Sequence, residues 1–213
     1  MGENELSDEC FTSRIFFSNG VFLVEGPSEV LFYHELANQL GIDLDFLNLT
    51  ILSVDGISFS VYVNILNALE IPWVMRTDND VSKLPNKDLW QYSGINRCLS
   101  LAGYESFTHS NKLISSFELL SNGSWKAVSD IVNCKGIFLS KIDLENDLVS
   151  ELPGPILESL GKTSEKASVD YLQSKKAIRM RELLKGIGGD LMRLKSGEIA
   201  KPLFCLTNIS SKD

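Results

Sequence analysis

The sequence predicts an α/β protein in which a parallel β-sheet is flanked by helices and interrupted by a helical insertion. Short apolar runs that are typical of buried strands alternate with segments of helical periodicity, and the connections are short. Such alternation produces parallel strands joined by right-handed crossovers. Two of the predicted strands end abruptly in carboxylates, at the edge where open α/β sheets build their sites.

The first part of the chain contains three predicted strands and two helices. The strands cover 15–24, with a break at Asn19-Gly20, then 50–54 and 72–77. Helices are predicted over 28–40, ended by Gly41, and over 58–69, because apolar side chains recur there at helical spacing. This order gives β-α-β-α-β, the pattern of a parallel sheet whose strands are joined by two crossover helices.

The alternation stops between Lys83 and Asn133. Two helices are predicted there, around 95–102 and 113–120, so we interpret 83–133 as a helical insertion into a core made of 1–82 and 134–213. The second part of the core is predicted to hold a fourth strand over 136–140, a helix over 144–152, a breaker at Pro153-Gly-Pro155 and one long helix over 164–184, ended by Gly186, Gly188 and Gly189.

The composition indicates a globular protein. A chain of 213 residues with 44% apolar content can bury one sizeable core. No apolar run approaches the length of a membrane span, and the first residues are acidic where a signal peptide would be basic, so we expect a cytoplasmic protein without a membrane partner. The four cysteines are scattered, which favours separate thiols over disulfides or zinc ligation, and neither His34 nor His109 is predicted to be a ligand.

The charge distribution is uneven. The formal net charge of −8 argues against a nucleic-acid binder. The stretch from Tyr171 to Lys201, however, holds eight Lys or Arg against three acids. It could face a phosphate backbone, with Lys175 and Arg179 as DNA contacts. A solvated helix face is the alternative explanation for most of these charges.

Four acidic side chains follow the first and third predicted strands. Glu25 closes the first strand and Glu29 lies in the next helical turn, while Asp78 and Asp80 stand two apart after the third strand. Hard carboxylate oxygens suit Mg²⁺ or Mn²⁺ better than zinc. Glu29 could instead complement a helix dipole, and the two aspartates could form an Asx-turn. We favour a metal site because clustered carboxylates repel one another unless cations bind.

Five segments, in this order along the chain, resemble the Toprim (topoisomerase–primase) domain and, more closely, its variant in the overcoming-lysogenisation-defect (OLD) nucleases. They are Leu23-Val-Glu-Gly-Pro-Ser-Glu29, Val54-Asp-Gly-Ile-Ser-Phe59, Thr77-Asp-Asn-Asp80, the segment 136–148, and Leu172-Gln-Ser-Lys-Lys176. The resemblance extends from about Ile15 to Leu184. It implies a Toprim-type parallel sheet with a helical insertion.

The resemblance also implies two bound divalent cations, Mg²⁺ or Mn²⁺. One would be held by Glu29, Asp78 and Asp80. The other would be held by Glu145 and Asp147 with help from Glu25, which could also act as a general base. Gly26 makes the turn after Glu25, and Gly56 is expected to let the backbone approach a neighbour or a ligand. Asp55 is interpreted as a surface-turn residue and Asp143 as a helix N-cap.

A lysine pair completes the predicted site. On one continuous helix Lys176 shares its face with Leu172 and Met180, whereas Lys175 is rotated by about 100° together with Arg179. A lysine on an apolar face needs an anionic partner. We therefore place the family's catalytic lysine at Lys176, with Lys175 as the alternative.

The activity implied by the resemblance is a metal-dependent DNA endonuclease with a two-metal mechanism, in which Lys176 offsets transition-state charge. The implied partners are DNA, an N-terminal ATP-binding cassette ATPase through which the protein would oligomerise, and a helicase in phage defence or repair. No Walker sequence occurs here, so ATP would act only through an ATPase domain absent from this chain. A topoisomerase or primase, and a non-catalytic Toprim scaffold, are the alternatives.

Overall fold

The computed structural model describes residues 15–56, 58–84, 86, 89–107 and 115–210. Its centre is a parallel four-stranded sheet with the strand order β2-β1-β3-β6. The strands are β1 (Gly20–Val24), β2 (Leu49–Ser53), β3 (Trp73–Thr77) and β6 (Ile137–Leu139). In this register Leu23 pairs with Leu52 on one side and with Met75 on the other. The predicted α/β class with a parallel sheet is therefore confirmed.

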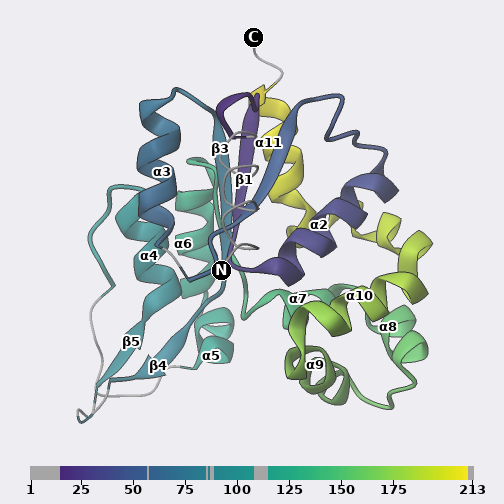
Figure 1. The fold of residues 1–213 in the computed structure, drawn as a ribbon. Helices are drawn as coiled ribbons and strands as arrows, with labels where there is room; N and C mark the ends of the chain where they lie inside the picture. The colour runs from purple at the N-terminus through teal and green to yellow at the C-terminus, as the bar shows by residue number, and fades with distance from the viewer. Residues whose placement is uncertain (1–14, 57, 85, 87–88, 108–114, 211–213) are drawn as a thin grey trace, which may run out of the picture.

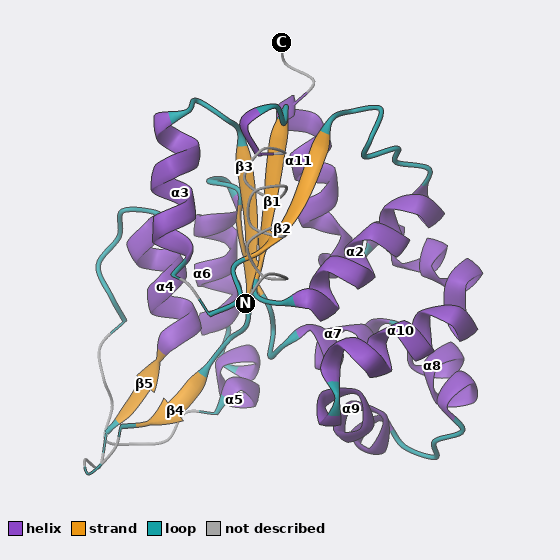
Figure 2. Ribbon diagram, in the orientation of Figure 1, coloured by secondary structure: helices purple, strands orange, loops and turns teal. Residues whose placement is uncertain are grey.

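Helices cover both faces of the sheet, as Figures 1 and 2 show. One face carries α2 (Pro27–Leu40), α7 (Leu144–Glu151), α8 (Pro153–Leu160), α9 (Glu165–Ser174), α10 (Lys176–Ile187), the 3-10 segments η1 (Gly188–Ser196) and η2 (Glu198–Ala200), and α11 (Lys201–Ser210). The other face carries α3 (Phe59–Ala68), α4 (Ser93–Leu101), α5 (Ser116–Ser121) and α6 (Ser124–Asn133). Because both faces are covered, every residue of β1 is buried.

Local sequence explains the ends of the elements that position the site. Pro27 begins α2, where its fixed φ and missing N–H cost nothing. Gly41 ends the same helix in the left-handed region, at φ 71°. The predicted strands and helices between Gly20 and Thr77 are confirmed. The segment before them is not, because residues 15–17 form a helical turn and β1 begins only at Gly20.

Of two predictions in the last third of the chain, one is confirmed and the other is wrong. The breaker at Pro153-Gly-Pro155 is confirmed, because α7 ends at Glu151 and Leu152 is not helical. The same residues also begin α8, which was not predicted, because proline is tolerated in the first helical turn. The predicted long helix over 164–184 is two helices, α9 and α10. They are separated at Lys175, whose φ of −149° and ψ of 64° are not helical.

The region 83–133 contains more than the two predicted helices. A hairpin of β4 (Val81–Lys83) and β5 (Trp90–Tyr92) precedes α4, and α6 was not anticipated from the sequence. Both α4 and α6 pack against β6. The division of the chain into a core and an insertion remains a prediction. Cys10, His109 and the start of the helix predicted over 113–120 lie outside the described residues.

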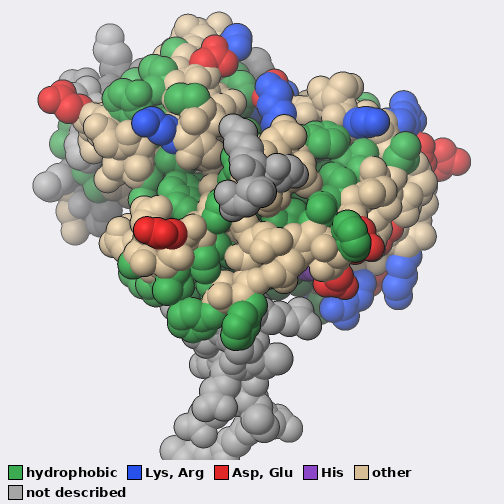
Figure 3. Space-filling view, turned by 90° about the horizontal axis from the view of Figure 1, so that it is seen from above, with side chains coloured by type: hydrophobic (Ala, Val, Ile, Leu, Met, Phe, Trp, Pro, Cys, Tyr) green, Lys and Arg blue, Asp and Glu red, His purple; other side chains and the backbone are tan. Residues whose placement is uncertain are grey.

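The amino ends of the strands form a face with little charge. Phe16 and Phe17 precede β1 and Phe46 precedes β2, and all three side chains are exposed. Figure 3 views this end of the molecule, where hydrophobic and uncharged surface predominates and charged side chains are scattered. In the part of the chain that the structure describes, no helix is long and apolar enough to cross a membrane.

Candidate functional site

Acidic side chains from three strand ends meet at the carboxyl edge of the sheet. Glu25 follows β1, Asp78 and Asp80 follow β3, and Glu145 and Asp147 lie in the first turn of α7, which follows β6. Glu29, in the first turn of α2, belongs to the same group. The structure therefore brings together at one sheet edge all six of the acids that the sequence predicted to bind metal.

Glu25 is held by three donors. Its Oε1 accepts hydrogen bonds from Thr77 Oγ1 (2.5 Å), from the backbone N–H of Asp78 (2.9 Å) and from Arg97 Nη1 (2.6 Å). Burial alone would raise the pKa of Glu25, but these bonds and the charge of Arg97 hold it below its usual value. Glu25 is therefore ionised and fixed in place.

Asp78 and Asp80 lie in a less favourable environment for charge. Burial, and then the charge of Glu25, raises the pKa of Asp78 to about 8. The same two causes raise the pKa of Asp80, although Arg97 Nη2 lies 3.2 Å from its Oδ2. Ser140 Oγ is 3.5 Å from Asp78 Oδ1, at the limit of a hydrogen bond. A bound cation would relieve the repulsion between these carboxylates.

Glu145 is the least satisfied acid of the group. Its side chain is buried, and neither of its oxygens has a hydrogen-bond partner among the described residues. The nearest positive charge is Lys176, whose Nζ lies 3.9 Å from Glu145 Oε2 and 3.9 Å from Asp78 Oδ2. Burial raises the pKa of Glu145 and also that of Glu29. A buried carboxylate without donors costs free energy, which a bound metal ion would offset.

The donor set fits a hard divalent cation. The oxygens come from carboxylates, with Ser140 beside them, and Glu145 lacks any other partner. Among the described residues, no three His, Cys, Asp or Glu side chains already lie close enough together to enclose an ion. Instead Arg97 lies between Glu25 and Asp80, and Lys176 between Asp78 and Glu145. Four of the six acids thus form two pairs, each bridged by a cation of the protein.

Asp147 differs from the other acids because both of its oxygens already accept hydrogen bonds. Oδ2 accepts from Arg76 Nη2 (2.7 Å) and from the N–H of Lys141 (3.1 Å), and Oδ1 accepts from the N–H of Ile142 (3.3 Å). Both members of the Arg76–Asp147 ion pair are buried. Metal binding by Asp147 stays a prediction, whereas these contacts tie the first turn of α7 to β3.

This arrangement predicts a stability effect for Asp147→Ala. Removing one member of a buried ion pair leaves Arg76 uncompensated, at a cost of about 3–5 kcal/mol. For a domain of this size the melting temperature should fall by roughly 10 °C. Differential scanning fluorimetry in EDTA measures it, with Asp170→Ala on the exposed side of α9 as the control. An unchanged melting temperature would instead favour the predicted ligand role.

Of the two lysines only Lys176 lies within ion-pair distance of the acids, although not for the reason deduced from the sequence. Lys176 begins α10, shares its face with the buried Met180 and Leu183, and reaches the acids with a half-exposed side chain. Lys175 is exposed at the break between the helices. Leu172 lies on a different helix, so the argument from one continuous helical face was wrong.

Arg179, predicted to contact DNA, has partners within the protein. Its Nη1 donates to Tyr171 Oη and to Glu182 Oε2, both at 2.6 Å, and its guanidinium lies 4.2 Å from the centre of the Tyr171 ring. DNA contact by Arg179 remains a prediction.

The glycines and turn residues have local explanations. Gly56 adopts φ 82°, which a residue with a Cβ rarely does, but a Cβ there would meet no described atom within 4 Å. The positive φ accounts for the glycine, and the close approach to a neighbour or a ligand stays a prediction. At Gly26 a Cβ would make ordinary contact, 3.5 Å from Glu29 Oε2. Asp143 is the N-cap of α7, as predicted, and Asp55 lies in an exposed turn.

Two residues of α4 that contact the site, Arg97 and Gly94, were not predicted from the sequence. Arg97 lies on α4, far along the chain from Glu25, and no spacing links the two. Gly94, on the same helix, lies against the backbone of Asp78 and Asn79. A glycine in the first turn of an amphipathic helix was the one available signal.

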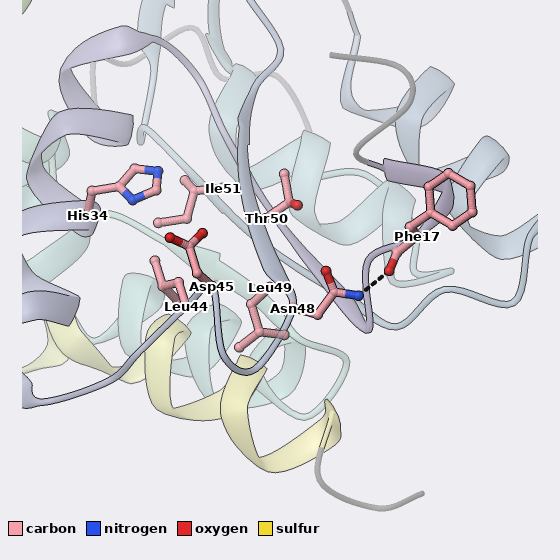
Figure 4. A pocket seen from close by; sticks show the side chains of 8 residues that line it. All are labelled: Phe17, His34, Leu44, Asp45, Asn48, Leu49, Thr50 and Ile51. Atoms are coloured by element: carbon pink, nitrogen blue, oxygen red, sulfur yellow. Dashed lines mark hydrogen bonds between the residues drawn. The ribbon is translucent and has the colours of Figure 1, made fainter. Parts of the chain in front are cut away.

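A hollow of about 380 Å³ lies at the amino end of β2, away from the sheet edge that carries the acids (Figure 4). His34 of α2 and Asp45 line it, together with residues of 48–51, and Asn48 donates to the carbonyl of Phe17 beside it. It is built around the amino end of an edge strand, whereas the acids gather at the carboxyl end of the sheet. This hollow is therefore separate from the candidate site.

The fold and the acidic sheet edge define a Toprim-type α/β domain, and the comparisons with known proteins agree. Residues 16–80 match the TOPRIM domain of overcoming lysogenization defect protein-like proteins. The chain is 32% identical over 190 residues to Endonuclease GajA of Bacillus cereus (strain VD045), covering 82% of this chain and 32% of that protein. It thus spans about a third of that relative's length. The chain carries the Toprim domain of the OLD family.

Two solved structures share this fold. The C-terminal region of the Burkholderia pseudomallei OLD protein is 22% identical, with a TM-score of 0.56 over 92% of this chain and 100% of that one. The C-terminal region of the Xanthomonas campestris pv. campestris OLD protein is 23% identical, with a TM-score of 0.52 over 93% of this chain and 96% of that one. At this level of identity the likeness shows the fold alone.

Proposed function

We propose that this chain is the catalytic region of a metal-dependent DNA endonuclease. The observation that carries the proposal is Glu145, a buried carboxylate without a hydrogen-bond partner among the described residues, at the sheet edge where the other acids gather. Such a side chain favours a bound cation. The similarity to Endonuclease GajA supports the choice of nuclease chemistry.

Different residues would have different roles in phosphodiester hydrolysis. Divalent cations, when bound, would supply electrophilic stabilisation and an activated water. These cations would be held by the carboxylates of Glu25, Glu29, Asp78, Asp80 and Glu145.

Other residues would act around those ligands. Lys176, half-exposed between Asp78 and Glu145, can reach a phosphate oxygen and offset the charge that develops there. Asp147 and Arg76 would position the first turn of α7, while Lys175 and Arg179 would contact the DNA backbone.

A plasmid-cleavage assay tests the proposal. We expect nicking or linearisation of supercoiled plasmid with Mn²⁺ or Mg²⁺, and none with EDTA. Equal activity in EDTA would contradict the metal mechanism. Failure to cleave with Mg²⁺, Mn²⁺ or Ca²⁺ would favour a scaffold role for the domain.

The two lysines give a second test. Lys176→Ala should lower the cleavage rate at least a hundredfold, on the order of 3 kcal/mol, because one transition-state contact is lost. Lys175→Ala is the matched control. It should cost much less, and its effect should disappear as salt is raised, because it would report only phosphate attraction. A dead Lys175→Ala beside an active Lys176→Ala would reverse the assignment.

The partners are part of the same proposal. Endonuclease GajA is about three times as long as the segment that aligns with this chain. Its remaining length is sufficient for the N-terminal ATPase region that the family resemblance implies. ATP would act through that region. Oligomerisation through it and a helicase partner remain predictions.

A further inference from the structure

The guanidinium of Arg97 lies among the acids that are expected to bind metal. Its Nη1 is 2.6 Å from Glu25 Oε1 and its Nη2 is 3.2 Å from Asp80 Oδ2, so one side chain spans two carboxylates from different strand ends. Its Nη1 also contacts Thr77 Oγ1. Arg97 comes from α4, outside the strand-end motifs.

The two bridging cations are not held equally. Lys176 Nζ is 3.9 Å from each of its acids, at the limit of an ion pair, and its side chain is 49% exposed. Arg97 is closer to its acids and only 29% exposed. The guanidinium occupies one oxygen of each acid, Glu25 Oε1 and Asp80 Oδ2. A divalent ion that coordinates either of these two oxygens must therefore replace a bond to Arg97.

Space for a displaced Arg97 side chain lies next to its present position. Its guanidinium carbon lies 5.7 Å from the centre of the Phe59 ring, within the range of a cation–π contact. A hollow of about 330 Å³ lies beside it, lined by Glu25, Gly56, Ser58, Phe59 and Arg97 itself. The side chain could move over this ring without leaving the edge of the site.

We propose that Arg97 is the resident counter-cation of the metal-free site and competes with divalent ions for Glu25 and Asp80. It thereby sets the affinity of the weaker metal-binding step. In the metal-free state it stabilises two acids that would otherwise repel each other. This inference rests on the proposed metal-dependent function.

The test is Mn²⁺ binding to the full chain, followed by the electron paramagnetic resonance signal of free Mn²⁺. The parent should bind in two steps, and Arg97→Gln should tighten the weaker step about tenfold, because a competing charge is removed. Arg97→Lys should tighten it less, because an ammonium cannot span both acids. It also serves as the test if Arg97→Gln does not fold. Arg193→Gln removes an exposed arginine elsewhere and should change the affinity less than twofold.

The outcomes separate this inference from the function on which it rests. No Mn²⁺ binding by the parent would overturn both. Binding and cleavage by the parent, with an unchanged or weaker second step in Arg97→Gln, would overturn only the role of Arg97. Unchanged affinity with slower cleavage would mean that Arg97 acts on the DNA instead.

Discussion

Replacing Asp78 with asparagine should abolish plasmid cleavage and, at the same time, stabilise the metal-free domain. Loss of a carboxylate at the centre of the site should cost on the order of a thousandfold in rate, because cation binding and charge stabilisation both depend on it. The stabilisation follows from repulsion: Asp78 is buried beside Glu25, and an amide of the same shape carries no charge.

The stabilisation should depend on pH in a defined direction. The pKa of Asp78 is raised from its usual 3.8 to about 8 in the folded state. Between these values the folded state binds more protons than the unfolded state, so the contribution of Asp78 to stability falls as pH rises and is fully lost above about pH 8. Asparagine does not titrate. The advantage of Asp78→Asn over the parent should therefore grow from pH 5 to pH 8.

Thermal melts in EDTA measure this effect. We expect a melting temperature for Asp78→Asn roughly 2–6 °C above the parent at pH 8, for about 1–2 kcal/mol of relieved repulsion, and a smaller difference at pH 5. Mn²⁺ should raise the melting temperature of the parent and leave the variant nearly unchanged. Asp170→Asn, on an exposed surface, controls for charge. A variant that cleaves normally, or melts lower than the parent at pH 8, would contradict the assignment.

The acids of the site could be predicted from the sequence because they lie at strand ends. A buried strand that stops at Glu25, and another that stops at Asp78, must deliver both side chains to the same edge once the strands are parallel. Short-range pattern and topology together fix these positions. Glu145 is placed by the family resemblance alone, and the structure puts it in the first turn of α7, which follows β6.

The neighbours of the acids could not be predicted, because tertiary packing decides them. Arg97 meets Glu25 across 72 positions of sequence, and Arg76 meets Asp147 across 71. Asp147 resembles a ligand in the sequence, yet Arg76 and two backbone N–H groups engage its oxygens. The break at Lys175 was equally hidden, since the apolar spacing continues across it. Backbone geometry overrode the local helical pattern there.

Gly94→Ala should abolish plasmid cleavage without replacing any of the acids. The first turn of α4 lies directly against the loop that carries Asp78 and Asp80, and Ser93 N–H donates to the Asp80 carbonyl at 2.8 Å. A Cβ on Gly94 would collide with the Asp78 carbonyl oxygen and would lie 2.9 Å from Asn79 Cα. Since both contacts are backbone, no side chain can move aside, and either the loop or the helix must shift.

The expected cost has two parts. Overpacking of this kind typically destabilises by about 1–3 kcal/mol, or roughly 3–10 °C in melting temperature. Because a misplacement of about 1 Å can cost a hundredfold, and both aspartates and Arg97 depend on this contact, cleavage should fall by roughly a thousandfold. Gly154→Ala is the matched control, since a Cβ at that helical position would meet no atom of the described residues within 4 Å. Normal cleavage by Gly94→Ala, at a temperature where it is folded, would show that the loop tolerates displacement and that α4 does not position the site.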